Sequence, residues 1–199
     1  MKYAFKFSAS GHEHAIERAE RLLSEVPGGA QKALLRAVNR ALAEGRTAAV
    51  RAVTSRYQIR AGDVRPTFHM KKAHLSKLEA ELSSSGEKLE LRDFKHTPKT
   101  DTTGANRKRV RVAVERRGGL KPLGQAFIYR GHIFSRTGKM AVASKGWHKG
   151  QKVEQIEKKF GLAVPQMVAH PEVSDDVANK MREAVDKRLD HEVNRILKV

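Results

Sequence analysis

The longest periodic pattern in the sequence is AQKALLRAVNRALAEGRTAAVRAVTSRY, residues 30–57, and it sets the architecture. At about 100° per residue, apolar side chains gather on one helical face and most basic side chains on the opposite face. The apolar set is Leu34, Val38, Ala41, Leu42, Ala49 and Ala52, and the opposite set is Lys32, Arg36, Arg40, Thr47 and Arg51. We predict a helix over about residues 30–57 whose alanine-rich face packs closely on another helix or a sheet. Gly45 is its weak point, because glycine costs about 1 kcal/mol relative to alanine in a helix interior.

Upstream of this helix, the sequence predicts one strand and one shorter helix. Aromatic residues alternate with polar or small ones over residues 2–8, as in a strand with an aromatic face. Ser10 and Glu13 have capping-box spacing, and apolar residues then recur at helical intervals. We expect this helix to end before Pro27, because proline lacks a backbone donor and restricts the residue before it.

Downstream, the patterns are shorter and mostly those of strands and turns. We predict a capped helical turn at 59–70, then a strand, turn and strand at 74–94, and then a mobile basic or polar loop at about 95–108. A strand at 107–117, a tight hairpin at 126–134 and a basic loop at 144–152 should follow. The chain should end with a short apolar piece at 160–167 and an amphipathic C-terminal helix that begins at Ser174-Asp175-Asp176. The fold class is therefore α+β, with a mainly antiparallel sheet packed against the long helix and the C-terminal helix. A chain of 199 residues suits one such domain over residues 1–199.

The charge balance points to an anionic partner. Forty Lys and Arg residues against 22 Asp and Glu give a net charge of +18, which costs self-repulsion unless a polyanion or an acidic protein lies nearby. The absence of cysteine excludes disulfides and thiolate zinc sites. The sequence lacks an N-terminal signal pattern and any run approaching the ~20 apolar residues of a membrane span. We expect a protein that is cytosolic where it is made and has no membrane partner.

Motifs for catalysis are missing. The sequence contains no phosphate-binding loop, no GxGxxG, no GxSxG and no HExxH. His12 and His14 are two residues apart, and we interpret the histidines as solvated surface residues rather than metal ligands. Acid pairs such as Asp175 with Asp176 are explained as helix caps. We therefore expect no enzyme, no catalytic residue, no cofactor and no metal, with a basic nuclease as a remote alternative.

The strand RKRVRVAVERR, residues 107–117, concentrates the basic charge. Its valines share one parity, whereas Arg109, Arg111 and Glu115 share the other, so we expect the valines to pack under the sheet against the long helix. The outward arginines face DNA, an acidic partner or only water, and any nucleic-acid contact should follow charge and shape. The candidate contacts to DNA or to an acidic partner are Arg36, Arg40, Arg107, Arg109, Arg111, Arg116, Arg117, Lys145 and Lys149.

Three segments, taken in order, resemble the prophage minor tail protein Z family of long-tailed bacteriophages. They are AVNRALAEGRTAAVRAVTSRYQIRAGDVR at 37–65, PLGQAFIYRGHIFSR at 122–136, and GLAVPQMVAHPEV with KRLDHEVNRIL within 161–197. Each motif is short, but the ordered set spans most of the chain.

This resemblance implies a structural virion protein that completes the head-proximal end of the tail tube and helps join tail to head around the DNA channel. It implies a homo-oligomeric ring, six-fold as in the tail, with other tail and neck proteins as partners: a tail terminator, tail tube or head-tail joining proteins. Contact with packaged DNA is a further expectation, and Tyr3, Phe5 and Phe7 could pair with a sheet edge of the next subunit. The alternative is a free, sequence-nonspecific nucleic-acid-binding protein.

Overall fold

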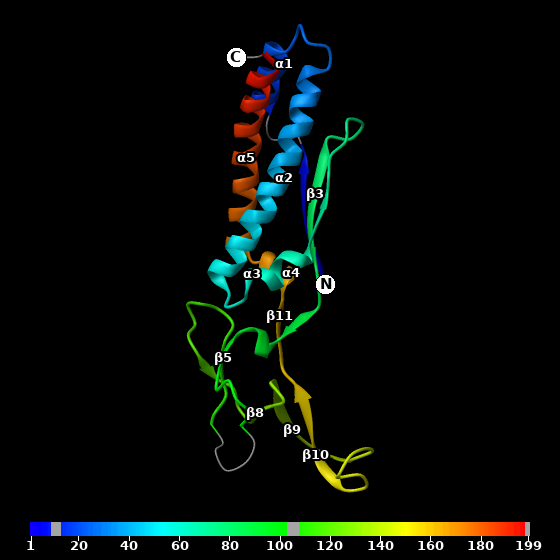
Figure 1. The fold of residues 1–199 in the computed structure, drawn as a ribbon, viewed down its shortest axis with the longest axis vertical. Coiled ribbons are helices and arrows are strands. Elements are labelled where there is room, and N and C mark those ends of the chain that lie inside the picture. The colour runs from blue at the N-terminus through cyan, green and yellow to red at the C-terminus, as the bar shows by residue number, and fades with distance from the viewer. Residues whose placement is uncertain (9–12, 103–107, 198–199) are drawn as a thin grey trace. The chain divides into compact units, whose positions relative to one another are not determined.

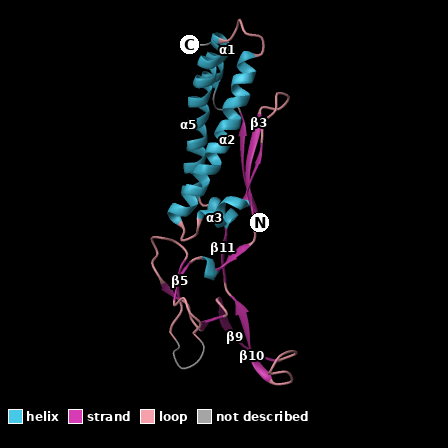
Figure 2. Cartoon of the chain, viewed as in Figure 1, coloured by secondary structure: helices cyan, strands magenta, loops and turns pink. Residues whose placement is uncertain are grey.

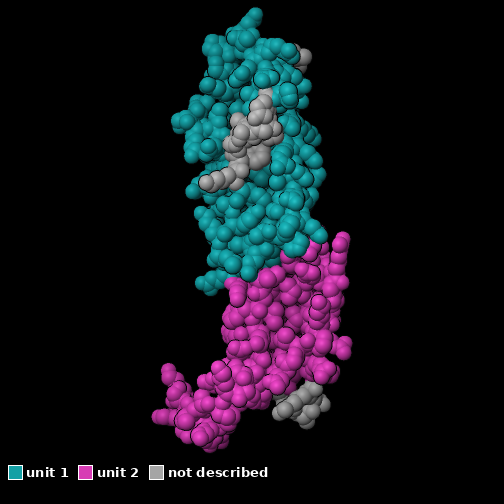
Figure 3. Space-filling model, turned by 180° about the vertical axis from the view of Figure 1, so that it is seen from behind, with its two compact units in different colours: residues 1–54, 60–87, 163–199 teal, residues 55–59, 88–162 magenta. Residues whose placement is uncertain are grey.

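The computed structural model describes residues 1–8, 13–102 and 108–197 (Figure 1). The chain is α+β, as the sequence predicted. It divides into two compact units, of which unit 1 comprises residues 1–54, 60–87 and 163–199, and unit 2 comprises residues 55–59 and 88–162 (Figure 3). The α-helices lie in unit 1, apart from Ser55 and Arg56 at the end of the longest one (Figure 2). The expected single domain over residues 1–199 stays a prediction.

Unit 1 is built on two long helices that lie side by side (Figure 1). Its helices are α1 (Glu13–Leu22), α2 (Gly29–Arg56), α3 (Ala61–Val64), α4 (Val164–Val168) and α5 (Pro171–Leu197), with a 3-10 turn, η1, at Arg65–Thr67. The long-helix prediction is confirmed to within one residue at each end. The predicted apolar face of α2 is buried, and α5 buries a matching row from Val173 to Val193. Burial of these apolar side chains is the main driving force for the packing of the two helices.

Two details of these helices differ from the sequence prediction. Helix α5 begins at Pro171 rather than at Ser174, because the His170 carbonyl already accepts the N–H groups of Val173 and Ser174 and proline suits the first helical position. Gly45 is a packing requirement and not only a weak point. A Cβ atom there would lie 2.5 Å from Cγ of Met181, so glycine lets α5 approach α2 closely.

The sheet of unit 1 differs from the predicted strand, turn and strand. It contains β1 (Lys2–Ser8), β3 (Glu79–Ser85) and β2 (Phe68–Lys71) in the order β1-β3-β2, with both pairs antiparallel. Since β1 and β2 occupy both edges of β3, the next strand, β4 (Lys88–Glu90), pairs instead with β11 (Phe160–Ala163). The two predicted strands exist, but they are not each other's partners.

Unit 2 consists of short strands and one long hairpin. Its remaining strands are β5 (Lys95–Thr97), β6 (Arg111–Ala113), β7 (Lys121–Pro122), β8 (Ala126–Tyr129), β9 (His132–Val142) and β10 (Lys152–Lys158), and a 3-10 turn, η2, covers Leu91–Asp93. They form the sheets β5-β6-β7 and β10-β9-β8. Within the described residues, the predicted antiparallel sheet is thus distributed over four small sheets.

The predicted strand at 107–117 is much shorter than expected. Only Arg111–Ala113 forms a strand, and the chain then bends so that Glu115 bridges to Tyr57. Val110 and Val112 are buried as their parity predicted, but they belong to unit 2, whereas residues 29–54 of α2 belong to unit 1. The expected packing of these valines on the long helix stays a prediction.

The predicted loop at about 95–108 is anchored over its first part. Lys95–Thr97 pairs with β6 as strand β5. The Asp101 carboxylate accepts the backbone N–H groups of Arg130 and Gly131 at 2.9 and 3.2 Å, and the Thr102 hydroxyl accepts the N–H of Ile128 at 2.8 Å. Residues 103–107 lie outside the described residues, and the mobility of the loop stays a prediction.

Candidate partner-binding surfaces

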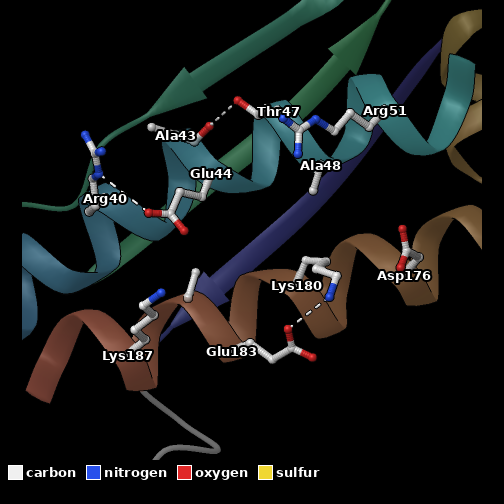
Figure 4. Close-up of a pocket in the computed structure, with 11 residues that line it drawn as sticks. Arg40, Ala43, Glu44, Thr47, Ala48, Arg51, Asp176, Lys180, Glu183 and Lys187 are labelled. Atoms are coloured by element: carbon white, nitrogen blue, oxygen red, sulfur yellow. Dashed lines mark hydrogen bonds and ion pairs between the residues drawn. The ribbon is translucent and has the colours of Figure 1, made fainter.

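A pocket of about 560 Å³ lies along the seam between α2 and α5 in unit 1 (Figure 4). Its walls combine alanines with charged side chains of both signs: Arg40, Ala43, Glu44, Thr47, Ala48 and Arg51 from α2, and Asp176, Lys180, Glu183, Ala184 and Lys187 from α5. Lys180 and Glu183 pair with each other at 3.1 Å. Such a balanced lining gives no strong preference for an anionic or a cationic ligand.

Two of the predicted contact residues, Arg36 and Arg40, lie along the same seam. The Arg36 guanidinium lies 3.4 Å from the carboxylate of Glu192 on α5, and Arg40 lies 3.6 Å from Glu44 on its own helix. Glu44 in turn accepts two hydrogen bonds from Arg188 on α5, at 2.6 and 2.9 Å. The pairs of Arg36 with Glu192 and of Arg188 with Glu44 join the two helices. Arg36 and Arg40 are therefore partly neutralised, although their side chains stay at least half exposed.

The other basic candidates lie in unit 2 and fall into two groups. Arg109, Arg111, Arg116 and Arg117 lie in or beside β6, and Lys145 and Lys149 lie in the loop between β9 and β10. All six are exposed, and the parity that directs Arg109 and Arg111 outward is confirmed. Arg107 lies outside the described residues. The sequence alone located these residues correctly on the surface, but it gave no distance between the two groups.

A carboxylate on β4 is surrounded by cationic and hydrogen-bonding groups of unit 2. Glu90 accepts hydrogen bonds from Nδ1 of His132 at 2.6 Å and Nζ of Lys158 at 3.2 Å, and Nε of Arg92 lies 3.2 Å away. Because Arg92 can only donate, its contact with Nε2 of His132 at 3.2 Å places the imidazole proton on Nδ1. Burial alone would raise the pKa of Glu90, but hydrogen bonds from His132 and Lys158 and the charge of Arg92 outweigh it and lower that pKa.

This cluster, which we call the Glu90 clamp, consists of Glu90, Arg92, His132 and Lys158. It fastens β4 to β9 and β10, strands that are more than 40 residues away in the chain. Sequence reasoning missed the clamp because charged residues at such separations carry no local signal. Its four side chains are hydrogen-bonded or ion-paired to one another, which indicates a structural role rather than a catalytic one.

The long hairpin of β9 and β10 is the second feature that the sequence did not resolve. The tight turn at Arg130 and Gly131 is confirmed, with positive φ at both residues, as a two-residue hairpin turn requires. Strand β9, however, continues to Val142 and pairs with β10 well beyond the end of β8. The predicted basic loop at 144–152 therefore becomes the tip of a second hairpin. The alternation of polar and apolar residues in KMAVAS, 139–144, and KVEQIE, 152–157, was the sequence signal for these two strands.

The aromatic face of β1 is only partly described. The rings of Tyr3 and Phe5 meet edge to face at 5.1 Å, and both side chains are half-buried. Phe7 lies on the same strand, but its side chain lies outside the described residues. Within the described part of the chain, no strand pairs with the other edge of β1. Its role as a subunit contact stays a proposal.

Comparison with known proteins adds the decisive observation. The family model of prophage minor tail protein Z (GPZ) matches residues 10–199. The chain belongs to this family. The match spans α1 to α5 and both units, and no curated protein and no solved structure matches the chain.

Membership of the minor tail protein Z family gives the chain a structural role in a phage tail. It follows that the chain is a virion component and that its partners include other tail proteins. Within the described residues, no group of three or more His, Asp or Glu side chains could hold a metal ion. In the same part of the chain, no helix is long and apolar enough to cross a membrane.

Proposed function

We propose that this minor tail protein completes the head-proximal end of the tail tube and joins tail to head around the DNA channel. The observation that carries the proposal is the exposed basic surface of unit 2 in a chain of this family. Arg109, Arg111, Lys145 and Lys149 are exposed, and none has an ion pair within the described residues. Unpaired surface cations suit a channel filled with DNA or an acidic neighbour in the particle.

We further propose that the protein acts as a homo-oligomeric, six-fold ring. One edge of β1 pairs with no strand in the described part of the chain, and this supports the ring, because unpaired N–H and C=O groups of an edge strand are a template for pairing with another chain. Ring formation would also explain the half-buried aromatic face of Tyr3 and Phe5. Sedimentation velocity of the purified protein, alone and with tails, measures the stoichiometry, and a monomer in both states would contradict the ring.

The test of the proposed function is electron microscopy of virions made without this chain. We expect heads and tails that fail to join, or joined particles that do not deliver DNA, and we expect the wild-type chain supplied in trans to restore infectivity. Normal infectious particles assembled without the chain would refute the proposal.

The same exposed cations favour one alternative, a free nucleic-acid-binding protein without sequence preference. This alternative predicts that the isolated chain binds duplex or single-stranded DNA with an affinity that falls steeply as salt rises. It also predicts that particles lacking the chain join normally. The two functions are therefore separated by the virion experiment and not by DNA binding alone.

A further inference from the structure

We propose that the outer part of the β9–β10 hairpin, residues 136–156, is a docking arm for another protein of the tail. We call this segment the arm, and we infer that its partner has an apolar patch with an acidic rim. The proposal rests on the membership in a tail protein family and not on the head-proximal position.

The arm is a two-stranded ribbon. Strand β8 pairs with β9 only over His132–Ser135. Beyond it, Arg136 and residues 140–142 of β9 pair only with β10 among the described strands. An isolated two-stranded ribbon is at best marginally stable in water. Even so, it exposes large apolar side chains, with Met140 62% and Val142 61% exposed. Contact with a partner would cover these groups and stabilise the ribbon.

The two most exposed apolar side chains of β9 in the arm, Met140 and Val142, lie on one face. Met140 and Val142 are two residues apart on β9, and their cross-strand partners are Glu154 and Lys152. Glu154 is already neutralised, because it lies 3.0 Å from the Arg136 guanidinium and accepts the N–H of Gly138 at 3.1 Å. This face therefore combines an apolar pair with the positive charge of Lys152.

The tip of the arm presents a tryptophan on a closed loop. Backbone hydrogen bonds of 2.9 Å join Ala143 to both Gln151 and Gly150, and the His148 ring bonds the Gln151 side chain at 3.0 Å. Trp147 projects from this loop and is 93% exposed. Since the loop is held by its own bonds, little ordering would be needed when Trp147 is buried by a partner.

Charge then restricts the chemistry of the partner. The segment 139–153 contains four lysines and no acidic residue. The lysines are Lys139, Lys145, Lys149 and Lys152. All of them are exposed, and none has an ion pair within the described residues. An acidic rim on the partner would complement them and speed association.

A protein fits the arm better than duplex DNA or a second copy of this chain. Tryptophan and methionine are enriched in the buried cores of protein interfaces, and exposed Met140 and Val142 have no counterpart in a phosphate backbone. The arm of a second copy carries the same four lysines and no acidic residue over 139–153, so two arms would repel each other.

The experiment measures binding of the purified full-length protein to tails that were assembled without this chain. Binding is followed by co-sedimentation at several salt concentrations. We compare the wild type with Trp147→Ala, with Lys145→Glu/Lys149→Glu, and with the charge-matched control Lys95→Glu/Lys121→Glu, whose lysines are exposed elsewhere in unit 2. Circular dichroism checks that each variant is folded.

We expect Trp147→Ala to weaken binding about tenfold or more, as truncation of an interface hot spot does. The Lys145/Lys149 variant should weaken binding mainly at low salt, because screening already removes that attraction at high salt. The Lys95/Lys121 control should bind like the wild type.

Absence of tail binding by the wild type would overturn the proposal, and so would any of three results with the variants. One is unchanged tail binding by both arm variants. Another is loss of duplex DNA binding by the arm variants with tail binding unchanged, which would make the arm a DNA contact. The third is loss of self-association with tail binding unchanged, which would make it a contact between copies. Infectious particles made without the chain would refute the proposed joining function and leave these binding results standing.

Discussion

At Gly45 the backbone of α2 comes so close to Met181 on α5 that any side chain would collide with it. A glycine that looks like a helix defect in the sequence is thus the residue that allows the two long helices to pack. Two opposing effects act at this position. Alanine would gain about 1 kcal/mol of helix propensity, but overpacking a filled core costs about 1–3 kcal/mol.

We predict that Gly45→Ala lowers the free energy of unfolding by about 1 kcal/mol, because overpacking against Met181 outweighs the gain in propensity. The measurement is urea denaturation followed by the helical circular dichroism signal. In a Met181→Ala background the same change should stabilise the protein, because the obstructing side chain is gone. Equal effects of Gly45→Ala in the two backgrounds would contradict this interpretation.

Asn39 is a second residue whose role only the structure reveals. Its side-chain amide donates to the Ala73 carbonyl at 3.1 Å, and its oxygen accepts the Ala73 N–H at 2.9 Å. Ala73 is buried and lies between β2 and β3, so this pair of bonds joins α2 to the sheet connection.

We predict that Asn39→Ala costs about 2 kcal/mol of unfolding free energy, because it leaves a buried N–H and a buried C=O without partners. Thermal unfolding provides the measurement. Asn39→Asp keeps the shape but loses the donor, so it should also destabilise the protein. A change of Tm indistinguishable from zero for both variants would show that other groups replace these bonds.

At the scale of elements, the Glu90 clamp links β4 to the long hairpin, and its stability depends on pH. The pKa of Glu90 is lowered from its ordinary value of 4.5, so the folded state prefers the carboxylate. A lowered folded pKa gives a stabilisation that is present above the unfolded pKa and is lost as the pH falls through the folded pKa. The stabilisation from ionised Glu90 is therefore lost over a pH range that lies below about pH 4.5.

We predict that Glu90→Gln costs about 1 kcal/mol at pH 7 and that the difference from the wild type shrinks as the pH falls below about 4.5. Urea denaturation at a series of pH values provides the measurement. The matched control is Glu87→Gln, since Glu87 is exposed and has no ion pair within the described residues. A difference between Glu90→Gln and wild type that stays constant down to pH 3 would argue against the clamp.

The elements differ in how far the sequence predicts them. Helix α2 and the β8–β9 turn follow from local patterns: the 3.6-residue periodicity in α2, and Arg130-Gly131 between two apolar runs in the hairpin. The pairings of β1 with β3 and of β4 with β11 join segments far apart in sequence. No local pattern specifies which of several short strands lie next to each other, so these pairings were missed.

At the scale of the whole molecule, the dominant property is the net charge of +18. Much of the basic surface of unit 1 is engaged in ion pairs such as Arg36 with Glu192. The exposed arginines beside β6 are different, because Arg109 and Arg111 have no ion pair within the described residues. They are thus the strongest candidates for contact with the phosphate backbone.

We predict that Arg109→Glu/Arg111→Glu leaves the fold intact and weakens binding to duplex DNA, because two phosphate contacts are lost. The slope of log affinity against log salt should become shallower by about 2. Filter binding at several salt concentrations measures this slope. The charge-matched control Lys32→Glu/Lys72→Glu in unit 1 should change the slope less, and an equal change would show that only overall charge matters.

The same double variant tests tail function. We expect it to impair tail joining or DNA passage in a complementation assay if these arginines line the channel or meet an acidic neighbour. Full particle activity from a folded variant would show that they form only a solvated strand face.

The fold class, the long helix, the basic surface and the resemblance to the tail protein family could all be read from the amino acids, because periodicity, charge and ordered motifs are properties of the chain itself. The surface exposure of Arg109, Arg111, Lys145 and Lys149 followed from the same patterns. Other features depend on residues that meet only after folding. They are the strand pairing, the Glu90 clamp, the contact of Gly45 with Met181 and the length of the β9–β10 hairpin. Contacts between distant segments are selected by the packing of the complete chain, and this is why they required the tertiary structure.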